Sequence, residues 1–268
     1  MWIKTKKNIL LIVLTLFLSS FILVACSNSA NTTKPKDNHN QQDVNPLFEK
    51  AQSLFDEDKY DEAYKIFKQL AEQGDAKAQN ALGNGYQHGF WGETDLKQAK
   101  KWFQKAADQN YVGGIHNLGI LEFLQGNYKQ ALPYFEKAAN MNNADSINML
   151  GVYHQEGIVF EQDYKKALSY FSQAIDIDAD NASTLFNIGQ AYYYGEGVEQ
   201  DYKKAFVWLT KSANKDYSLA QIQLAEMYFS GKGVNKNAAK AIEIIKPLAE
   251  LGDPKAQQNL KWYIDHPN

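Results

Sequence analysis

The residue types that carry most enzymatic and metal chemistry are few and scattered in this chain of 268 residues. The only cysteine is Cys26, which excludes an intrachain disulfide and any site built from several cysteines. His88, His116 and His154 are far apart, and no phosphate-binding glycine loop, Gly-x-Ser-x-Gly elbow or His-Glu-x-x-His motif is present. The sequence therefore predicts no enzymatic activity, no cofactor and no metal site.

One acidic segment resembles the start of a calcium-binding loop. Asp176, Asp178 and Asp180 alternate as the first ligands of such a loop do. The loop then needs a glycine for its turn and a bidentate glutamate at its end, where this sequence has Asn181 and Asn187. We therefore interpret the segment as a connection between two helices.

The charged residues exclude further classes of function. The 28 basic residues are all lysines, so the chain has no guanidinium group to grip phosphates, and the net charge is −3. No basic cluster follows the first few residues, so nucleic-acid binding has no electrostatic basis. A hydrophobic content of 44% allows a packed core, while a mean hydropathy of −0.50 argues against a multispan membrane protein.

The first 25 residues have the organisation of a secretory signal. Three lysines precede an apolar stretch from residue 9 to residue 25. The stretch ends at Leu23-Val24-Ala25-Cys26, which resembles a bacterial lipobox, and this resemblance implies that the chain is cut before Cys26 and acylated on it. The alternative is an uncleaved signal anchor, because the stretch just reaches the length that spans a bilayer.

Residues 26–44 are expected to form a lipidated N-terminus followed by a flexible polar tether. The segment is rich in Asn, Ser, Thr, Gln and Lys and cannot bury a core. Ser27 stands where an aspartate would resemble an inner-membrane retention signal. The expected location is therefore the cell envelope, on the outer membrane facing the periplasm.

From residue 45 to residue 268 the sequence repeats itself every 32 to 38 residues. Each unit has a small residue in a first helix and another, 12 or 16 residues later, in a second helix. The first anchors are Ala51, Gly83, Gly119, Gly151, Gly189 and Ala225, with Lys261 in the same register, and the second anchors are Ala63, Ala99, Ala131, Ala167, Ala205 and Ala241. Bulky residues three and four positions after each second anchor indicate amphipathic helices. Helix N-caps are expected four residues before the second anchors, at Asp95, Asn127, Asp163, Asp201 and Asn237.

The units with the longer spacing share a specific string. Gly195-x-Gly197-Val198-x-x-Asp201-Tyr202-x-x-Ala205 resembles a Sel-like repeat, and the shorter units resemble tetratricopeptide repeats. The resemblance implies an all-α, right-handed superhelical solenoid of Sel-like and tetratricopeptide-like helix pairs. The helix that begins at Pro254 is expected to cap its C-terminal end. The pattern is broken at Val159, where the second glycine is lost.

The resemblance also implies a function. Solenoids of this type bind proteins on the concave face formed by their first helices. The residues of the first helices that line the concave face in the tetratricopeptide pattern are here called wall residues. Transferring their positions to this sequence gives the candidate protein-binding residues Asn84, Gln87, His116, Phe123, Gln155, Phe186, Gln190, Tyr193, Ile222, Glu226 and Phe229. The aromatic residues among them either anchor a partner or pack between neighbouring units.

We therefore expect a monomeric, lipid-anchored protein that binds other proteins and acts as an assembly scaffold without catalysis. One alternative is an immunity protein that neutralises an antibacterial lipase effector in the periplasm, because some lipoproteins of this repeat type do so. A second alternative is an enzyme of unrecognised type. The sequence does not name the partner.

Overall fold

The structure is a computed structural model that describes residues 45–266, and Cys26, the signal and the tether lie outside this range. Within it the chain forms thirteen helices and no strands, which confirms the expected all-α fold. The helices are α2 (Pro46–Asp56), α3 (Tyr60–Glu72), α4 (Ala76–His88), α5 (Leu96–Asp108), α6 (Val112–Leu124), α7 (Tyr128–Ala139), α8 (Ala144–Glu156), α9 (Tyr164–Ile177), α10 (Ala182–Tyr194), α11 (Tyr202–Ala213), α12 (Ser218–Ser230), α13 (Ala238–Glu250) and α14 (Pro254–Asp265). Even-numbered helices are the first helices of the repeats, and odd-numbered helices are the second.

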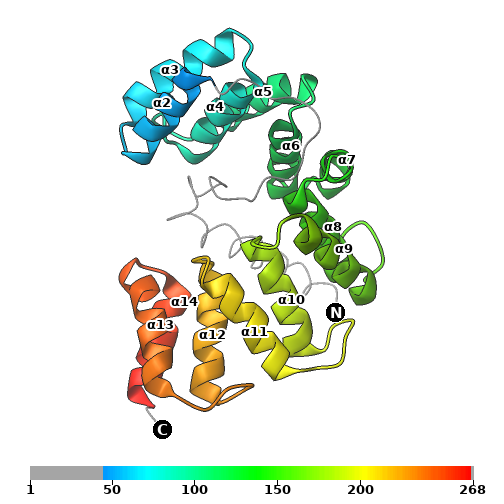
Figure 1. Cartoon of the computed structure of the whole chain (residues 1–268), viewed down its shortest axis with the longest axis vertical. Coiled ribbons are helices and arrows are strands. Elements are labelled where there is room, and N and C mark those ends of the chain that lie inside the picture. The colour runs from blue at the N-terminus through cyan, green and yellow to red at the C-terminus, as the bar shows by residue number, and fades with distance from the viewer. Residues whose placement is uncertain (1–44, 267–268) are drawn as a thin grey trace. The chain divides into compact units, whose positions relative to one another are not determined.

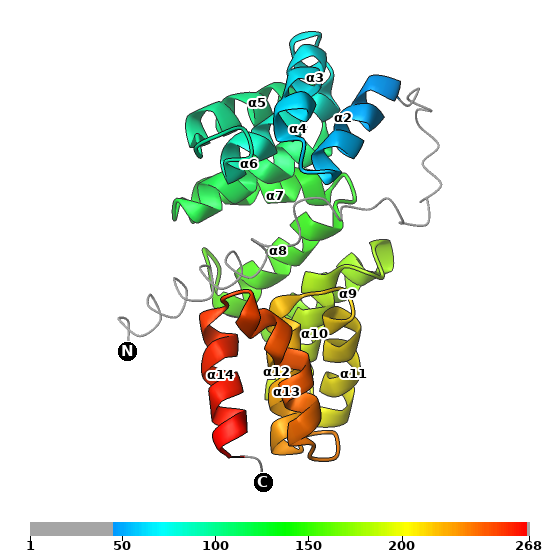
Figure 2. The ribbon, with the colours of Figure 1, turned by 90° about the vertical axis from the view of Figure 1, so that its left-hand side faces the viewer.

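The described helices fall into two compact units that divide inside α8. The N-terminal unit comprises residues 45–147 and the C-terminal unit residues 148–266. In the N-terminal unit, α2 packs with α3, α4 with α5 and α6 with α7. In the C-terminal unit, α10 packs with α11 and α12 with α13, and α14 runs beside α12 and α13 in both views (Figures 1 and 2). Both units are therefore stacks of helix pairs.

The small anchor residues mark the closest contacts within the pairs. A Cβ atom added to Gly83, Gly119 or Gly151 would lie 2.4, 2.8 or 2.4 Å from a phenylalanine ring of the paired second helix. The alanine anchors of the second helices are at most 2% exposed. The repeat of small residues in the sequence therefore marks a repeat of close helix contacts, because only a small side chain leaves room for the facing ring.

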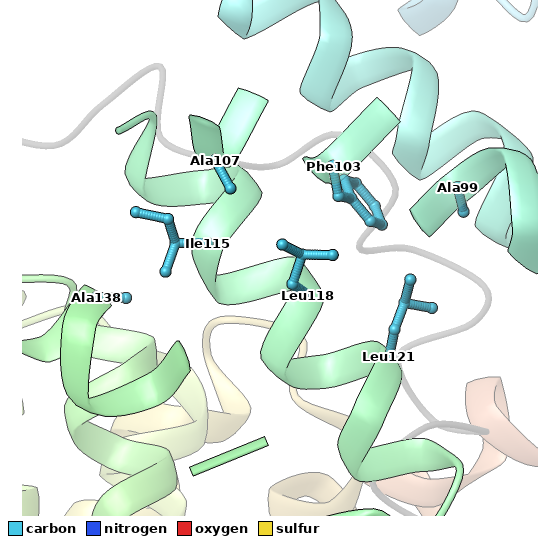
Figure 3. Packing of buried hydrophobic residues seen from close by; sticks show 7 residues of the cluster. All are labelled: Ala99, Phe103, Ala107, Ile115, Leu118, Leu121 and Ala138. Carbon is cyan, nitrogen blue, oxygen red and sulfur yellow. The ribbon is translucent and has the colours of Figure 1, made fainter. Parts of the chain in front are cut away.

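The core of the N-terminal unit shows how consecutive helices share one apolar layer. Seven buried side chains from three helices form this cluster, which Figure 3 shows from close by: Ala99, Phe103 and Ala107 of α5, Ile115, Leu118 and Leu121 of α6, and Ala138 of α7. Each large apolar side chain buried there stabilises the fold by about 1.5–3 kcal/mol. The cluster joins the second helix of one repeat to both helices of the next.

Four of the five expected N-caps are confirmed. The side chains of Asp95, Asp163, Asp201 and Asn237 each accept a hydrogen bond from a backbone amide in the first turn of the following helix. Asn127 also stands at the expected N-cap position, but the expected side-chain hydrogen bond is absent. Its Nδ2 donates instead to Glu122 Oε2 at 2.8 Å, and α7 begins without a side-chain cap.

The paired glycines of the Sel-like turns are required by backbone contacts. Gly195 and Gly197 have φ angles of 76° and 75°, in the left-handed region that favours glycine. A Cβ at Gly197 would lie 2.6 Å from the carbonyl oxygen of Tyr164, at the start of the preceding second helix. Gly233 makes the equivalent close approach in the next repeat, to the carbonyl oxygen of Tyr202.

Val159 occupies the same left-handed position with a β-branched side chain, at a φ of 68°. We expect Val159→Gly to raise the free energy of unfolding by about 1 kcal/mol, because glycine removes most of the left-handed strain and costs less than that in chain entropy. Denaturant unfolding measures this change. Val207→Gly, at an exposed helical position of α11, is the control and should lower the same quantity by about 0.5 kcal/mol. A destabilised Val159→Gly variant would contradict the strain argument.

Candidate functional site

The three described histidines within the repeats lie in separate surroundings. The ring of His154 stacks between Phe160 and Tyr170, with ring centroids 4.7 and 5.6 Å away. Burial lowers the pKa of His88, His116 and His154, so each ring is neutral at pH 7. Within residues 45–266, no three His, Cys, Asp or Glu side chains are grouped so that they could hold a metal ion.

The acidic segment covers the end of α9 and the turn that follows, so it forms a helix connection as we interpreted it. The backbone amide of Asp180 donates to Asp178 Oδ1 at 3.1 Å, and Asp180 forms an ion pair with Lys215 at 2.9 Å. These contacts tie the turn between α9 and α10 to the end of α11. Two of the three aspartates therefore have structural partners.

The predicted wall residues of the N-terminal unit lie along the first helices, and two of them bond to side chains of neighbouring first helices. Asn117 Nδ2 on α6 donates to the Oδ1 atoms of Asn80 and Asn84 on α4, at 2.9 and 3.0 Å. Gln87 Oε1 is buried without a hydrogen-bond partner. His116 Nδ1 lies 2.8 Å from the hydroxyl of a serine on α8. The amide side chains therefore connect neighbouring repeats.

Phe123 belongs to the core of that unit. Its side chain is 3% exposed and packs edge-on against Tyr128 and Phe135, with ring centroids 5.0 and 6.3 Å away. A partner cannot reach a side chain buried to this extent without unfolding the repeat. Phe123 therefore packs between helices, which is the second of the two alternatives for the aromatic residues.

The wall residues of the C-terminal unit form cross-links between α10 and α12. Gln190 Nε2 donates to Gln223 Oε1 at 3.3 Å, and the Tyr193 hydroxyl donates to Glu226 Oε1 at 3.4 Å. Lys232 Nζ, from the turn after α12, donates to the Tyr193 hydroxyl at 2.9 Å. The structure thus joins Tyr193 to Glu226 and Gln190 to Gln223, and it adds a lysine that the sequence had not singled out.

Burial separates the wall residues that pack from those that a partner can reach. Tyr193 and Ile222 are 5% and 8% exposed, and Phe229 stacks on Tyr263 with ring centroids 4.3 Å apart. Phe186 is half-buried against a tyrosine that precedes α12. Most of the predicted aromatic positions therefore hold neighbouring helices together.

Tyr194 is the accessible aromatic residue of this face. Its side chain is 56% exposed at the C-terminal end of α10. Glu226 is exposed and Gln190 is half-buried beside it on the same face of the first helices. The surface that a partner can touch is therefore one tyrosine ring among carboxylate and amide groups.

Two half-buried carboxylates at the C-terminal ends of α8 and α10 escaped the sequence reasoning. Glu156 ends α8, and Glu196 is the middle residue of the Gly195-x-Gly197 turn. Glu196 Oε2 accepts from Gln155 Nε2 at 3.3 Å, which places the predicted residue Gln155 in the same cluster. Burial raises the pKa of both carboxylates. In the next Gly-x-Gly turn the middle residue is Lys232. The charged middle residue of these turns was therefore the sequence feature that could have pointed to Glu196 and Lys232.

Comparisons with known protein families match almost the whole described chain. The Sel1 repeat matches residues 56–75, 76–111, 182–217 and 218–253, and the tetratricopeptide repeat matches residues 111–180. No curated protein sequence matches the chain. Among residues 45–266, no helix is both long enough and apolar enough to span a bilayer.

Solved structures with the same fold come from several bacteria. A Sel1 repeat protein from Oxalobacter formigenes is 28% identical, with a TM-score of 0.65 over 80% of this chain and 88% of its own. A protective antigen of uropathogenic Escherichia coli strains is 34% identical, with a TM-score of 0.56 over 73% of this chain and 42% of its own. An immunity protein from Pseudomonas aeruginosa is 20% identical, with a TM-score of 0.52 over 83% of both chains, and this likeness concerns the fold alone.

Proposed function

Because the chain belongs to the Sel1-like repeat proteins, we propose that it binds other proteins through its first helices and catalyses no reaction. The observation that carries this proposal is the exposed ring of Tyr194 on the first-helix face of the C-terminal unit. Exposed aromatic residues are frequent energetic anchors of protein interfaces, and the neighbouring amide and carboxylate groups give such an anchor its orientation. Repeat stacks of this kind present extended surfaces that suit a protein partner.

We expect Tyr194→Ala to reduce capture of the partner at least about tenfold while leaving the thermal midpoint nearly unchanged, because the ring is exposed. Tethered wild type and variant are compared by quantitative mass spectrometry of proteins recovered from the native membranes. Trp262→Ala, which removes a similarly exposed ring on α14, should keep full capture. Tyr193→Ala should instead lower the thermal midpoint, because Tyr193 is buried. Undiminished capture by Tyr194→Ala would place the binding surface elsewhere.

We also propose that Cys26 carries the lipid that holds the protein on the outer membrane, facing the periplasm. The support is the charged and then apolar signal that ends in Leu23-Val24-Ala25-Cys26. Cys26→Ser should leave full-length precursor and abolish labelling with a fatty acid. A mature wild-type protein that stays on membranes without lipid would refute the proposal.

Within this role we favour an assembly scaffold over an immunity protein. The likeness to the Pseudomonas immunity protein, at 20% identity, supports the common fold and not the common activity. Protection of cells against the product of an adjacent toxin gene would reverse this preference.

A further inference from the structure

A groove of about 340 Å³ runs between α13 and α14. Its apolar lining includes Ala249 of α13 and Leu260 and Ile264 of α14. Ile264 is 57% exposed, so part of this apolar lining meets water. Within residues 45–266, only α13 and α14 line the groove. In the described chain, α14 is therefore a first helix that has one apolar side left open.

The positions that line this groove hold a second helix elsewhere in the chain. Counted from the repeat anchors, Ala249 and Leu260 correspond to Ala107 of α5 and Leu118 of α6. Those two residues pack in one buried cluster with Ala138 of α7, the second helix of that repeat. The groove is thus the place in the stack that one further second helix would take.

A glutamine in the groove repeats a hydrogen bond found beside an occupied seat. Gln79 Nε2 of α4 donates to the carbonyl oxygen of Ala71 at 3.0 Å, and Gln257 Nε2 of α14 donates to that of Ala249 at 3.1 Å. Gln79 Oε1 also accepts at 2.8 Å from Nε2 of Gln109, the C-cap of the paired helix α5. Gln257 Oε1 accepts no hydrogen bond from the described chain. The acceptor that would receive a second helix is therefore free.

Lys261 distinguishes this seat from the others. The first anchors of the other repeats are glycine or alanine, and even a Cβ added to Gly83 would lie 2.4 Å from the ring of Phe103 on α5. A lysine at this position therefore takes the space that such a ring needs. Its ammonium group forms no ion pair within residues 45–266. A helix that covers Lys261 must offer it a carboxylate, because a covered charge without a partner is costly.

We propose that the groove lined by Ala249, Gln257, Leu260, Lys261 and Ile264, here called the α14 groove, binds an amphipathic helix of a partner protein. The helix carries an alanine where second helices have their anchor and an aspartate or glutamate four positions later, opposite Lys261. Its apolar face covers Leu260 and Ile264, and a side-chain donor near its C-terminal end bonds to Gln257. This surface belongs to other helices than the Tyr194 face and goes beyond the binding proposed there.

Synthetic helices test the α14 groove on the full chain in lipid nanodiscs. The probe is a blocked peptide with the sequence of residues 95–109, which spans α5 and both its caps, and it carries Phe103→Glu. Gln104→Lys with a lactam bridge to Asp108, on the exposed side of α5, keeps the peptide helical, because an isolated helix of this length is marginal in water. Two comparison peptides of the same design keep Phe103 or carry Phe103→Gln.

NMR methyl signals of Leu260 and Ile264 should shift in a saturable manner with the glutamate peptide. This peptide should bind at least about fivefold more tightly than the glutamine peptide, which lacks only the charge. It should bind at least about tenfold more tightly than the phenylalanine peptide, because the lysine takes the space of the ring. No shift of these methyl groups, or equal binding of the glutamate and glutamine peptides, would overturn the proposal.

Two variants of α14 separate the groove from general affinity for helices. Lys261→Ala restores a small anchor and should reverse the order, so that the phenylalanine peptide binds at least about tenfold more tightly than the glutamate peptide. The thermal midpoint should stay near the wild-type value, because Lys261 is exposed. Trp262→Ala removes a ring that does not line the α14 groove, and it should bind all three peptides as wild type does. An unchanged order of affinities in Lys261→Ala would overturn the role of the lysine in selecting the helix.

Sedimentation of the full chain without peptide tests a second copy of the chain as the occupant. Self-association that Ile264→Asp abolishes would assign the groove to a second copy and overturn the partner helix. Tyr194→Ala should bind the glutamate peptide as wild type does. Loss of the native partner in Tyr194→Ala with unchanged peptide binding, or the reverse, would therefore tell the two surfaces apart.

Discussion

Gly233→Ala is expected to lower the free energy of unfolding by about 3 kcal/mol or more. Two costs combine at this position. The φ of 73° is unfavourable for any residue with a Cβ, and the added Cβ would lie 2.1 Å from the carbonyl oxygen of Tyr202. A carbonyl at the start of a helix cannot rotate away as the end of a flexible side chain can. The turn and α11 must therefore move apart.

Gly231→Ala is the matched control for that prediction. Its φ of 74° imposes the same conformational cost, but the nearest atom to the added Cβ is the Lys236 Cβ, at 3.3 Å. We expect a loss of about 1 kcal/mol at Gly231. Denaturant unfolding of both variants isolates the backbone contact, because the conformational cost cancels in the difference. Equal losses of unfolding free energy in the two variants would mean that the close contact between Gly233 and α11 adds no cost.

Removing residues 254–268 is expected to cost about 3 kcal/mol or more and to make the protein self-associate. The deletion takes away Tyr263, which is 3% exposed and stacks on Phe229. It also uncovers Ile245 and Ala249, which are buried in the same cluster. Apolar side chains that lose their cover return to water at a cost of about 25 cal/mol for each Å² exposed.

Thermal unfolding and sedimentation of the shortened chain measure this effect, with both proteins compared in the same detergent. Trp262→Ala is again the control, because this ring of α14 is 55% exposed and its loss should change stability by less than about 0.5 kcal/mol. An unchanged melting curve after the deletion would show that α14 is not a cap. Lys261 supports the role of α14 as a cap. This exposed lysine stands where the first helices of the other repeats have a buried glycine or alanine.

The site could be predicted from the sequence only as far as the repeat register extends. The register places Gln190, Tyr193 and Glu226 on one face, and the structure joins the latter two by a hydrogen bond. The register gives no information on burial. The position of a residue in a repeat fixes the direction of its side chain but not how far neighbouring helices cover that side chain. Tyr193 and Tyr194 follow each other in the chain, yet they are 5% and 56% exposed.

The sequence by itself determined the all-α class, the helix pairs, their anchors and most of their caps. These properties are periodic and local, since a helix face or a capping oxygen depends on residues only a few positions apart. Asn127 lacks the expected capping bond because its backbone, with φ −82° and ψ 54°, is not in the extended conformation of the other four caps.

Only the tertiary structure decided which wall residues are core and which a partner can reach. Glu156 and Glu196 are 40 residues apart in the chain, yet α8 and the turn after α10 lie in contact, as the hydrogen bond from Gln155 to Glu196 shows. Burial and charge pairing depend on such distant contacts, which a repeat pattern does not encode. The face that we propose to bind a partner follows from the sequence register, whereas the exposure of Tyr194 beside the buried Tyr193 follows from the packing of the repeats.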